Sequence, residues 1–398
     1  MAEPVTSYIS SSWLKPLWAT LKAIRGARAL EIQKIKNDFA DPFELARYYV
    51  EPNCQHHNPA DHLEDQEPRS AVKSPVFKTI NDFLAGDYAV TGGGRNQMFI
   101  LSDADMGKTS LLVMLKLSHL TSFWPKHHRC ELLKLGPDTL DRVQANTAAG
   151  DTVLLLDALD EDRMAWGQIR ERLLEILDHT SHFRRVIISC RTQFFPEAGV
   201  DSFGNTGRVK LGGFTCPMIF LSLFDDGQVE EYIEKRYPDT WFRWFQAESK
   251  REQARGLVAK MKDLRCRPML LAHIEDLVKS SITDWSEYAV YEALPQAWLD
   301  REEVKLRKQG RHDITAQTLY RACLVVAEEM QTQGCRFLSE ATLNLRMKLH
   351  PELEHLTQIK FGGRSLLNRS AQGDYRFPQL LAIPALNLPV PHDKRKPA

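Results

Sequence analysis

Residues 98–110 read MFILSDADMGKTS: four apolar residues, a short polar turn, and Gly107-Lys108-Thr109 at the start of a helical pattern that reaches Leu120. An apolar strand, a turn and then Gly-Lys-Thr at a helix N-terminus are typical of a phosphate-binding loop. In such a loop the backbone N–H groups surround a β-phosphate, the lysine reaches the β- and γ-oxygens, and the threonine hydroxyl binds Mg²⁺. The alternative is a surface turn with an ordinary lysine. The candidate nucleotide-binding residues are Ser102, Asp103, Ala104, Asp105, Met106, Gly107, Lys108, Thr109 and Ser110.

A second segment, residues 151–157, reads DTVLLLD and ends in a carboxylate. Its continuous apolar run predicts a strand that is buried on both faces of a parallel sheet. Asp157 then lies at the carboxyl end of that strand, where open α/β sheets bind ligands. Because Asp160 and Glu161 follow closely, one carboxylate can hold Mg²⁺ while another polarises a water, as phosphoryl hydrolysis requires. The alternative is a solvated acidic loop that caps a helix starting near Met164.

A further buried strand is predicted over residues 184–191, RRVIISCR, which ends at Arg191 on the same edge of the sheet as Asp157. An arginine there can read or stabilise γ-phosphate charge, or it can face solvent at a strand end. Between Lys108 and Asp157 there is room for a helix, a strand over residues 130–135 and a second helix. The strand that ends at Asp157 therefore need not neighbour the strand before the loop, and another strand can lie between them.

These segments together resemble the NACHT NTPases of the STAND class, and bacterial members most closely. Residues 153–161, VLLLDALDE, resemble the family's extended acidic motif, and residues 187–191, IISCR, resemble its sensor strand and arginine. Residues 229–236, VEEYIEKR, are similar to the helix that opens the next domain, and residues 267–271, RPMLL, to the proline motif. A spaced set of motifs is far more specific than any one of them. The resemblance implies a P-loop NTPase that binds ATP or ADP with Mg²⁺, with Pro268 near the adenine.

Two residues depart from the pattern of the phosphate-binding loop. Ser102 stands where the loop consensus has its first glycine, and Asp105 stands where family members also carry glycine. Glycine at the second place permits a positive φ and a close approach of backbone to phosphate, whereas Asp105 adds a negative charge. Repulsion of about 1–4 kcal/mol would weaken nucleotide binding about tenfold or more. We therefore expect nucleotide binding rather than fast turnover.

The composition predicts a soluble cytoplasmic protein. The 398 residues, 43% of them hydrophobic, are enough for two or three domains, each with its own core. Lysine plus arginine equals aspartate plus glutamate at 52 each, so a nucleic-acid partner is not expected. The 7 cysteines, an odd number without paired spacing, fit a reducing compartment. No apolar run reaches the length of a transmembrane segment.

The pattern along the chain predicts an α/β fold: a P-loop NTPase core with a parallel sheet, followed by helical and winged-helix-like domains. An amphipathic helix is expected over Ser12–Ile32, and the proline-containing residues 52–74 are expected to form a linker. Two short strands around a turn are expected within residues 365–377, in a domain that the resemblance implies packs over the nucleotide. The expected domains are an N-terminal helical region and linker (1–74), the NACHT NTPase core (75–224), a helical domain (225–310), a winged-helix-like domain (311–377) and a poorly ordered tail (378–398).

The leading hypothesis is a STAND-type ATP-binding switch with slow Mg²⁺-dependent hydrolysis, which would control oligomerisation or signalling through an unknown protein partner. ADP would hold it closed, and ATP would favour an open state that can self-associate. The alternative from another class is a nucleotide-dead NACHT-like scaffold or interaction module, and a third is an ATPase that remodels nucleic acid. The expected roles are phosphate binding by Lys108, Mg²⁺ binding by Thr109 and Asp157, activation of water by Asp160 and Glu161, sensing of the γ-phosphate by Arg191, and adenine packing by Pro268.

Overall fold

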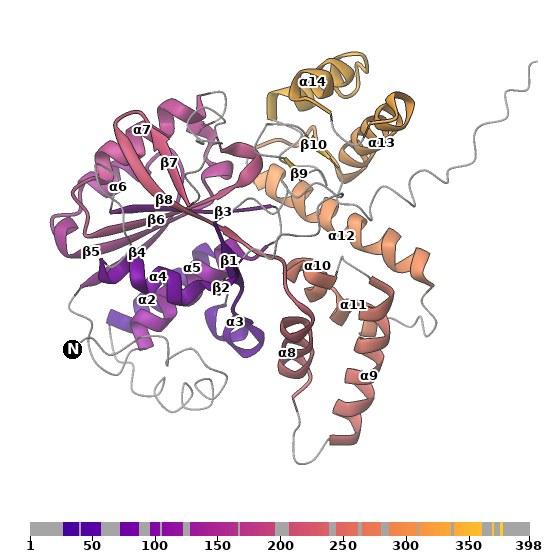
Figure 1. Cartoon of the computed structure of the whole chain (residues 1–398), viewed down its shortest axis with the longest axis horizontal. Helices are drawn as coiled ribbons and strands as arrows, with labels where there is room; N and C mark the ends of the chain where they lie inside the picture. Colours follow the sequence, from indigo (N-terminus) through magenta and orange to yellow (C-terminus); the bar gives the residue numbers. More distant parts are fainter. Residues whose placement is uncertain are drawn as a thin grey trace, which may run out of the picture.

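The fold is built on a central, mostly parallel β-sheet with helices on both faces (Figure 1). The computed structural model describes residues 27–39, 41–56, 72–86, 96–103, 106–121, 128–165, 168–195, 207–238, 244–261, 265–279, 286–308, 310–335, 338–359, 368–369 and 375–376. The strand order is β2-β1-β8-β3-β6-β5-β4, and β7 pairs with β8 beside this path. The strands of this sheet are β1 (Asn53–Gln55), β2 (Ser74–Pro75), β3 (Gln97–Ser102), β4 (Arg129–Lys134), β5 (Thr152–Asp157), β6 (Arg185–Arg191), β7 (Arg208–Leu211) and β8 (Phe214–Leu221).

The central strands are apolar throughout because both of their faces are covered. In β3, Phe99 and Leu101 belong to one buried cluster, while Met98 and Ile100 belong to another on the opposite face. This alternation follows from the two-residue period of a strand. Figure 1 shows the two layers of helices that complete these clusters. On one face lie α6 (Thr139–Gln144) and α7 (Ile169–Thr180), and on the other lie α2 (Ala27–Asp38), α4 (Val76–Ala85) and α5 (Lys108–Thr121).

Five neighbouring strands, β8, β3, β6, β5 and β4, are parallel. The strand that ends in Arg191 lies between the strand that precedes the phosphate-binding loop and the strand that ends in Asp157. The register pairs Ser102 with Arg191 and Lys134 with Asp157, so these four residues end their strands at one edge of the sheet. The predicted α/β fold with a parallel sheet is confirmed. The sequence left open whether a strand separates the other two, and the structure places β6 between them.

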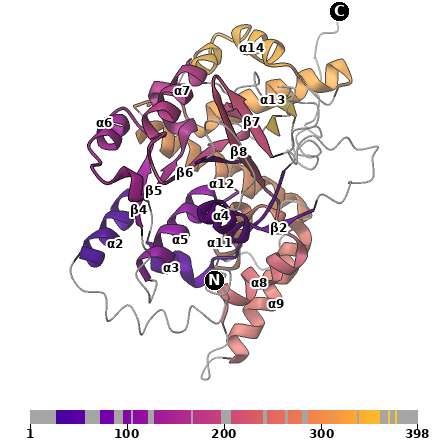
Figure 2. The same cartoon turned by 60° about the vertical axis from the view of Figure 1, so that its left-hand side comes forward.

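The C-terminal part of the described chain is helical and has two hydrophobic cores of its own. One core joins residues of α8 to α11, and the other joins residues of α13, α14 and η9. Figure 2 shows these two groups of helices at opposite ends of the molecule. The elements are α8 (Asp226–Arg236), α9 (Trp244–Met261), α10 (Pro268–Ala272), α11 (Ile274–Lys279), α12 (Glu287–Lys308), α13 (Ala316–Gln333), α14 (Glu340–Lys348), η9 (Glu354–Ile359) and the two-stranded sheet of β9 (Asn368–Arg369) and β10 (Tyr375–Arg376).

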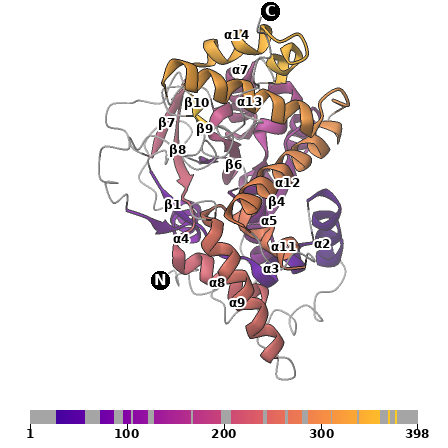
Figure 3. The ribbon, with the colours of Figure 1, turned by 90° about the vertical axis from the view of Figure 1, so that its right-hand side faces the viewer.

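The long helix α12 contributes to both C-terminal cores. Ala289 and Ala293 near its N-terminus pack against the α8 to α11 core, whereas Leu299 and Leu306 are buried with α13 and α14. Figure 3 shows α12 running between the two groups. A helix of this length spans about 33 Å, so α12 forms one continuous connection between the two cores.

Parts of the N-terminal region differ from the expectation. Within the described residues α2 begins at Ala27 and continues to Asp38, beyond the expected end at Ile32. In the expected linker, Asn53–Gln55 forms β1 and pairs with β8, because the Cys54 side chain is buried against the core. Residues 1–26 and 377–398, which include most of the expected N-terminal helix and the expected tail, lie outside the described residues. The domain boundaries stay predictions.

Within the described residues, no helix has both the length and the apolar character that crossing a membrane requires.

A buried ion pair next to the acidic segment provides a test of the fold. Asp162 is fully buried and accepts a hydrogen bond from Arg172 Nε at 2.9 Å, and its other oxygen accepts from the backbone N–H of Met164. We expect Asp162→Ala to lower the free energy of unfolding by about 3 kcal/mol, because it leaves the buried Arg172 undercompensated. Urea denaturation measures this change.

The matched control is Glu175→Ala, which removes the other and more exposed carboxylate partner of Arg172. Its expected effect is below about 1 kcal/mol. Equal effects of the two substitutions would contradict the interpretation that the buried Asp162 is the main partner that compensates Arg172.

Candidate functional site

The candidate site lies where β3, β5 and β6 end and α5 begins. Gly107 has φ of +81°, a left-handed conformation that glycine adopts without steric cost, and it turns the chain into α5. A Cβ at Gly107 would have no neighbour within 4 Å, so the space beside this turn is open. The first turn of an α-helix leaves N–H groups without partners inside the helix, so a turn of this geometry can bind an anion.

Lys108, the first residue of α5, has its ammonium group inside the loop. Lys108 Nζ donates to Ser102 O at 3.1 Å, to Ser102 Oγ at 2.8 Å and to Asp103 O at 2.9 Å. Burial lowers the pKa of Lys108, Asp160 opposes this shift, and Arg191 adds to it. All three hydrogens of the ammonium are thus held by acceptors of the loop itself, and a phosphate must replace some of them.

The departure of Ser102 from the glycine consensus has a simple structural explanation. β3 continues through Ser102, which pairs with Arg191 in parallel register and does not have a positive φ. The position therefore does not require glycine for its backbone conformation. The side chain instead supplies an extra acceptor to Lys108.

The other loop residues are only partly placed. Met106 is buried, whereas Ala104 and Asp105 lie outside the described residues, so the expected repulsion at Asp105 stays a prediction. The Asp103 carboxylate lies 3.6 Å from Arg267 Nη2. Arg267 immediately precedes Pro268, which is the first residue of α10. Residues 267–271, which include the Pro268 predicted to lie near the adenine, therefore contact the phosphate-binding loop through Arg267.

A chain of hydrogen bonds holds the candidate Mg²⁺ ligands. Thr109 Oγ1 donates to Asp157 Oδ2 at 2.8 Å, and Ser189 Oγ donates to Asp157 Oδ1 at 2.6 Å. Ser189 in turn accepts from the backbone N–H of Ala158 at 3.0 Å. Ala158 has φ of +61°, a conformation that is costly for a residue other than glycine and that directs the chain after β5. Thr109 and Asp157, from two different elements, are thus brought together.

Asp157 and Thr109 fit a Mg²⁺ ion by their chemistry. Burial raises the pKa of Asp157, while the hydrogen bonds from Ser189 and Thr109 oppose that shift. A buried carboxylate beside a hydroxyl offers the hard oxygen ligands that Mg²⁺ prefers, and the remaining ligands are commonly water and nucleotide phosphate. A cation at this position would offset the unfavourable burial of the charge.

The two acidic residues after Ala158 have different partners. Asp160 Oδ2 lies 2.8 Å from Arg191 Nε, and Asp160 Oδ1 accepts from the backbone N–H of Arg191 at 3.2 Å. Glu161 lies 2.7 Å from Lys134 Nζ and 3.7 Å from Lys305 Nζ. Burial alone would raise the pKa of Glu161, but the two ammonium groups hold that pKa below its ordinary value. Asp160 is therefore bound to the candidate sensor arginine, and Glu161 is bound to two cations.

Arg191 also binds a residue from outside the parallel sheet. Its Nη2 donates to Glu302 Oε1 of α12 at 2.9 Å, and both side chains are almost fully buried. Lys305, one turn further along α12, donates to the same Glu302 oxygen at 2.9 Å. The structure thus brings together, at one edge of the sheet, the predicted residues Lys108, Thr109, Asp157, Asp160, Glu161 and Arg191.

Five further residues of this site were missed from the sequence: Lys134, Ser189, Arg267, Glu302 and Lys305. Ser189 and Arg267 lie within the quoted motifs, so their motif positions were an available signal. Lys134 lies within the strand predicted over residues 130–135, and the structure pairs it with Asp157. Glu302 and Lys305 gave no such signal, because charged residues on a helix ordinarily face solvent.

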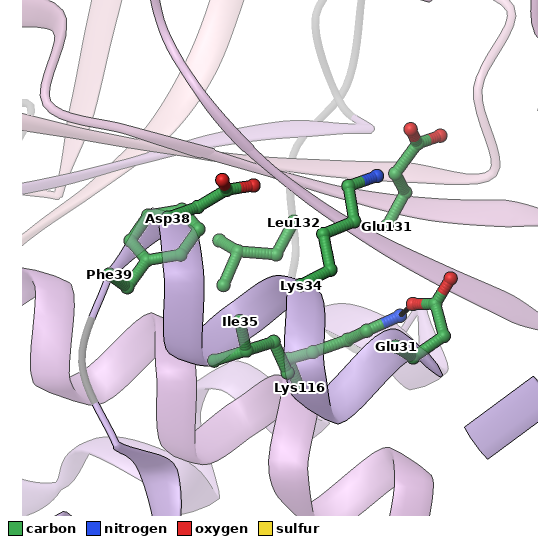
Figure 4. Close-up of a pocket in the computed structure, with 8 residues that line it drawn as sticks. All are labelled: Glu31, Lys34, Ile35, Asp38, Phe39, Lys116, Glu131 and Leu132. Atoms are coloured by element: carbon green, nitrogen blue, oxygen red, sulfur yellow. Dashed lines mark ion pairs between the residues drawn. The ribbon is translucent and has the colours of Figure 1, made fainter. Parts of the chain in front are cut away.

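A small cavity between α2 and the edge strand β4 lies outside this site (Figure 4). Its volume is about 10 Å³, which is enough for a single water molecule and far too small for a nucleotide. Lys116 lies beside it, and its Nζ pairs with Glu31 at 2.6 Å and donates to the Cys130 carbonyl. We therefore assign this cavity to the packing of α2 on the sheet.

No protein-family model and no curated protein matches the chain. Among solved structures it is similar to RuvB of Thermotoga maritima at 13% identity and a TM-score of 0.33, over 76% of this chain and 89% of RuvB. It is also similar to ORC2 of Aeropyrum pernix, at 12% identity and a TM-score of 0.33 over 82% of this chain and 94% of ORC2. For Cdc6p of Pyrobaculum aerophilum the identity is 12% and the TM-score 0.31, over 79% and 91% of the two chains. The P-loop NTPase fold of the core rests on its own strand order and loop geometry.

The environment of Asp157 provides a test of the site. Because burial raises the pKa of Asp157 in the folded protein, its ionised form is unfavourable there at neutral pH. We expect Asp157→Asn to raise the melting temperature of the ligand-free protein by about 1–3 °C. This gain should shrink as the pH falls towards the range in which Asp157 itself becomes protonated.

Thermal melts of the parent and the variant over a series of pH values measure this difference. A variant that melts below the parent at neutral pH would show that the ionised carboxylate stabilises the ligand-free site, contrary to this account.

Proposed function

We propose that this protein is an ATP-binding molecular switch of the STAND type with slow Mg²⁺-dependent hydrolysis. The observation that carries the proposal is the convergence of Lys108, Thr109, Asp157 and Arg191 on one edge of the sheet, from a loop, a helix start and two strand ends. This set combines a cation for phosphate, oxygen ligands for Mg²⁺ and an arginine for γ-phosphate charge. The NACHT resemblance supports the STAND class, since its quoted motifs include these same positions.

Each residue of the site has a role in this proposal. Lys108 exchanges its bonds to the loop for β- and γ-phosphate oxygens, while the N–H groups of the loop and of α5 surround the β-phosphate. Thr109 and Asp157 hold Mg²⁺, and Ser189 keeps the Asp157 carboxylate turned towards Thr109. Mg²⁺ held by Thr109 and Asp157 would supply positive charge to neutralise the charge that develops on the phosphate oxygens. Arg191 reads the γ-phosphate, which distinguishes ATP from ADP.

Slow turnover follows from the environment of the acidic residues. Lys134 and Lys305 hold the pKa of Glu161 below its ordinary value, so Glu161 is a weak acceptor for a proton from water. Asp160 is occupied by Arg191. A slow hydrolytic step suits a switch, because it gives the triphosphate state a long lifetime.

One observation favours the rival hypothesis of a nucleotide-dead scaffold. Lys108 donates to three acceptors within its own loop, and Ser102 Oγ is an acceptor that a glycine could not supply. If these bonds persist in the presence of nucleotide, Lys108 is a structural residue of the loop. Nucleotide binding by the parent and by a Lys108 variant separates the two hypotheses.

We expect MgATP to raise the melting temperature of the parent and to leave that of Lys108→Ala unchanged. Ligand at about 100 times its dissociation constant stabilises a protein by about 2.7 kcal/mol, which a thermal melt detects. Lys34→Ala, at an exposed lysine of α2, is the control and should respond like the parent. An unchanged melting temperature of the parent at millimolar MgATP would favour the scaffold.

The two acidic roles predict different kinetics. Glu161→Gln should leave the affinity for MgATP nearly unchanged and lower the hydrolysis rate, because the proposal assigns Glu161 to the attacking water and not to Mg²⁺ or phosphate. Asp157→Asn should lower both the Mg²⁺-dependent affinity and the rate. Calorimetric titration and single-turnover hydrolysis measure the two quantities, and equal losses of affinity in both variants would show that the roles are misassigned.

A further inference from the structure

Glu302 of α12 forms a buried ion pair with Arg191. Its carboxylate is 1% exposed, and Oε1 accepts from Arg191 Nη2 at 2.9 Å across 111 residues of sequence. Arg191 also binds Asp160 through Nε, at 2.8 Å. Two carboxylates, one from the core and one from α12, therefore share a single buried guanidinium group.

Lys305 extends this contact to the rest of the site. Lys305 follows Glu302 by about one turn of α12. Its Nζ lies 2.9 Å from Glu302 Oε1 and 3.7 Å from Glu161 Oε1. Glu161 also binds Lys134 at the end of β4. α12 thus presents one carboxylate and one ammonium group, and each binds an oppositely charged partner at the candidate site.

The rest of α12 is fixed in the C-terminal helices. Leu299 and Leu306, on either side of Glu302 in sequence, are fully buried among residues of α13 and α14. At its other end, Ala289 and Ala293 pack on the core of α8 to α11. Figure 3 shows the helix between these two groups. A displacement of Glu302 therefore moves the packing of both C-terminal cores relative to the sheet.

We infer that Glu302 is an intramolecular substitute for the γ-phosphate: it holds Arg191 and α12 in place until ATP supplies a competing anion. This inference rests on the proposed function. A carboxylate and a phosphate both bind arginine through paired N–H donors, so they compete for Arg191. A γ-phosphate beside Glu302 also adds like-charge repulsion. ADP lacks the γ-phosphate and therefore leaves the contact between Arg191 and Glu302 intact. Removal of the Glu302 charge should not make ADP bind more tightly.

The prediction is a selective change of affinity. In Glu302→Gln the competing charge is absent while the size and one acceptor oxygen are kept, so a non-hydrolysable ATP analogue with Mg²⁺ should bind about 5- to 10-fold more tightly than to the parent. The affinity for MgADP should change by less than about twofold. Calorimetric titration of both nucleotides into both proteins gives the ratio of the affinity for the ATP analogue to the affinity for ADP.

The matched control is Glu303→Gln, the same substitution one residue along α12. Glu303 pairs with Arg307 and accepts from the backbone N–H of Ala316, so its contacts lie within the C-terminal helices. This variant should bind both nucleotides like the parent. If Glu303→Gln shifts the ratio as much as Glu302→Gln does, the effect belongs to the packing of α12 and overturns the inference.

Hydrogen exchange of α12 amides provides a second readout, and its first comparison needs no nucleotide. Without ligand, Glu302→Gln should exchange faster than the parent in α12, and Glu303→Gln should not. In the parent, the ATP analogue should have the same effect as Glu302→Gln, and ADP should have none. If the α12 amides exchange equally slowly in the parent and in Glu302→Gln, the inference is overturned.

The outcomes separate the two proposals. If the parent binds both nucleotides and Glu302→Gln changes neither the ATP-to-ADP ratio nor the exchange of α12, the inference fails and the proposed function stands. If neither protein binds either nucleotide, the proposed function fails and the competition at Arg191 fails with it.

Discussion

The site is organised by one buried guanidinium group that two carboxylates share. Arg191 ends β6, the strand between those that end at Ser102 and Asp157, so its place in the sheet puts it between the phosphate-binding loop and the acidic segment. Asp160 orients it from the core, and Glu302 binds it from α12. A charge buried so deeply is stable only while it is compensated. Any anion that enters the site must therefore be accommodated by a change in these contacts.

Hydrogen bonds join side chains that belong to separate sequence motifs. Lys108 donates to Ser102 and Asp103, and Thr109 donates to Asp157. Ser189 of the neighbouring strand also donates to Asp157. The ligand-free site thus satisfies its polar groups internally, apart from the energetic disadvantage of the buried Asp157 charge. Ligand binding would exchange these internal bonds for bonds to phosphate and Mg²⁺. The affinity for a nucleotide would be the small difference in free energy between the bonds gained and the bonds lost. The extra acceptor of Ser102 would lower this affinity, because it stabilises the ligand-free position of Lys108.

Much of the core could be predicted from the sequence because β3, β5 and β6 are continuous apolar runs that end in polar residues. β8 could not, because Pro217 lies within it and proline disfavours a central strand. The structure accommodates Pro217 opposite Arg208 of β7, and parallel pairing with β3 begins only at Met218. Glu302 and Lys305 were missed for a different reason. Their contacts to Arg191 and Glu161 join segments far apart in sequence, and a charged pair on a helix carries no local sign of burial.

The central claim is that the loop between β3 and α5 binds a nucleoside triphosphate with Mg²⁺. Native mass spectrometry of the full chain, titrated with ATP in the presence and absence of Mg²⁺, tests it most directly. The account predicts a saturable adduct of one nucleotide per chain that Mg²⁺ strengthens and that is lost in Lys108→Ala. A parent chain that carries no nucleotide at millimolar ATP, or an adduct that survives unchanged in Lys108→Ala, would contradict it.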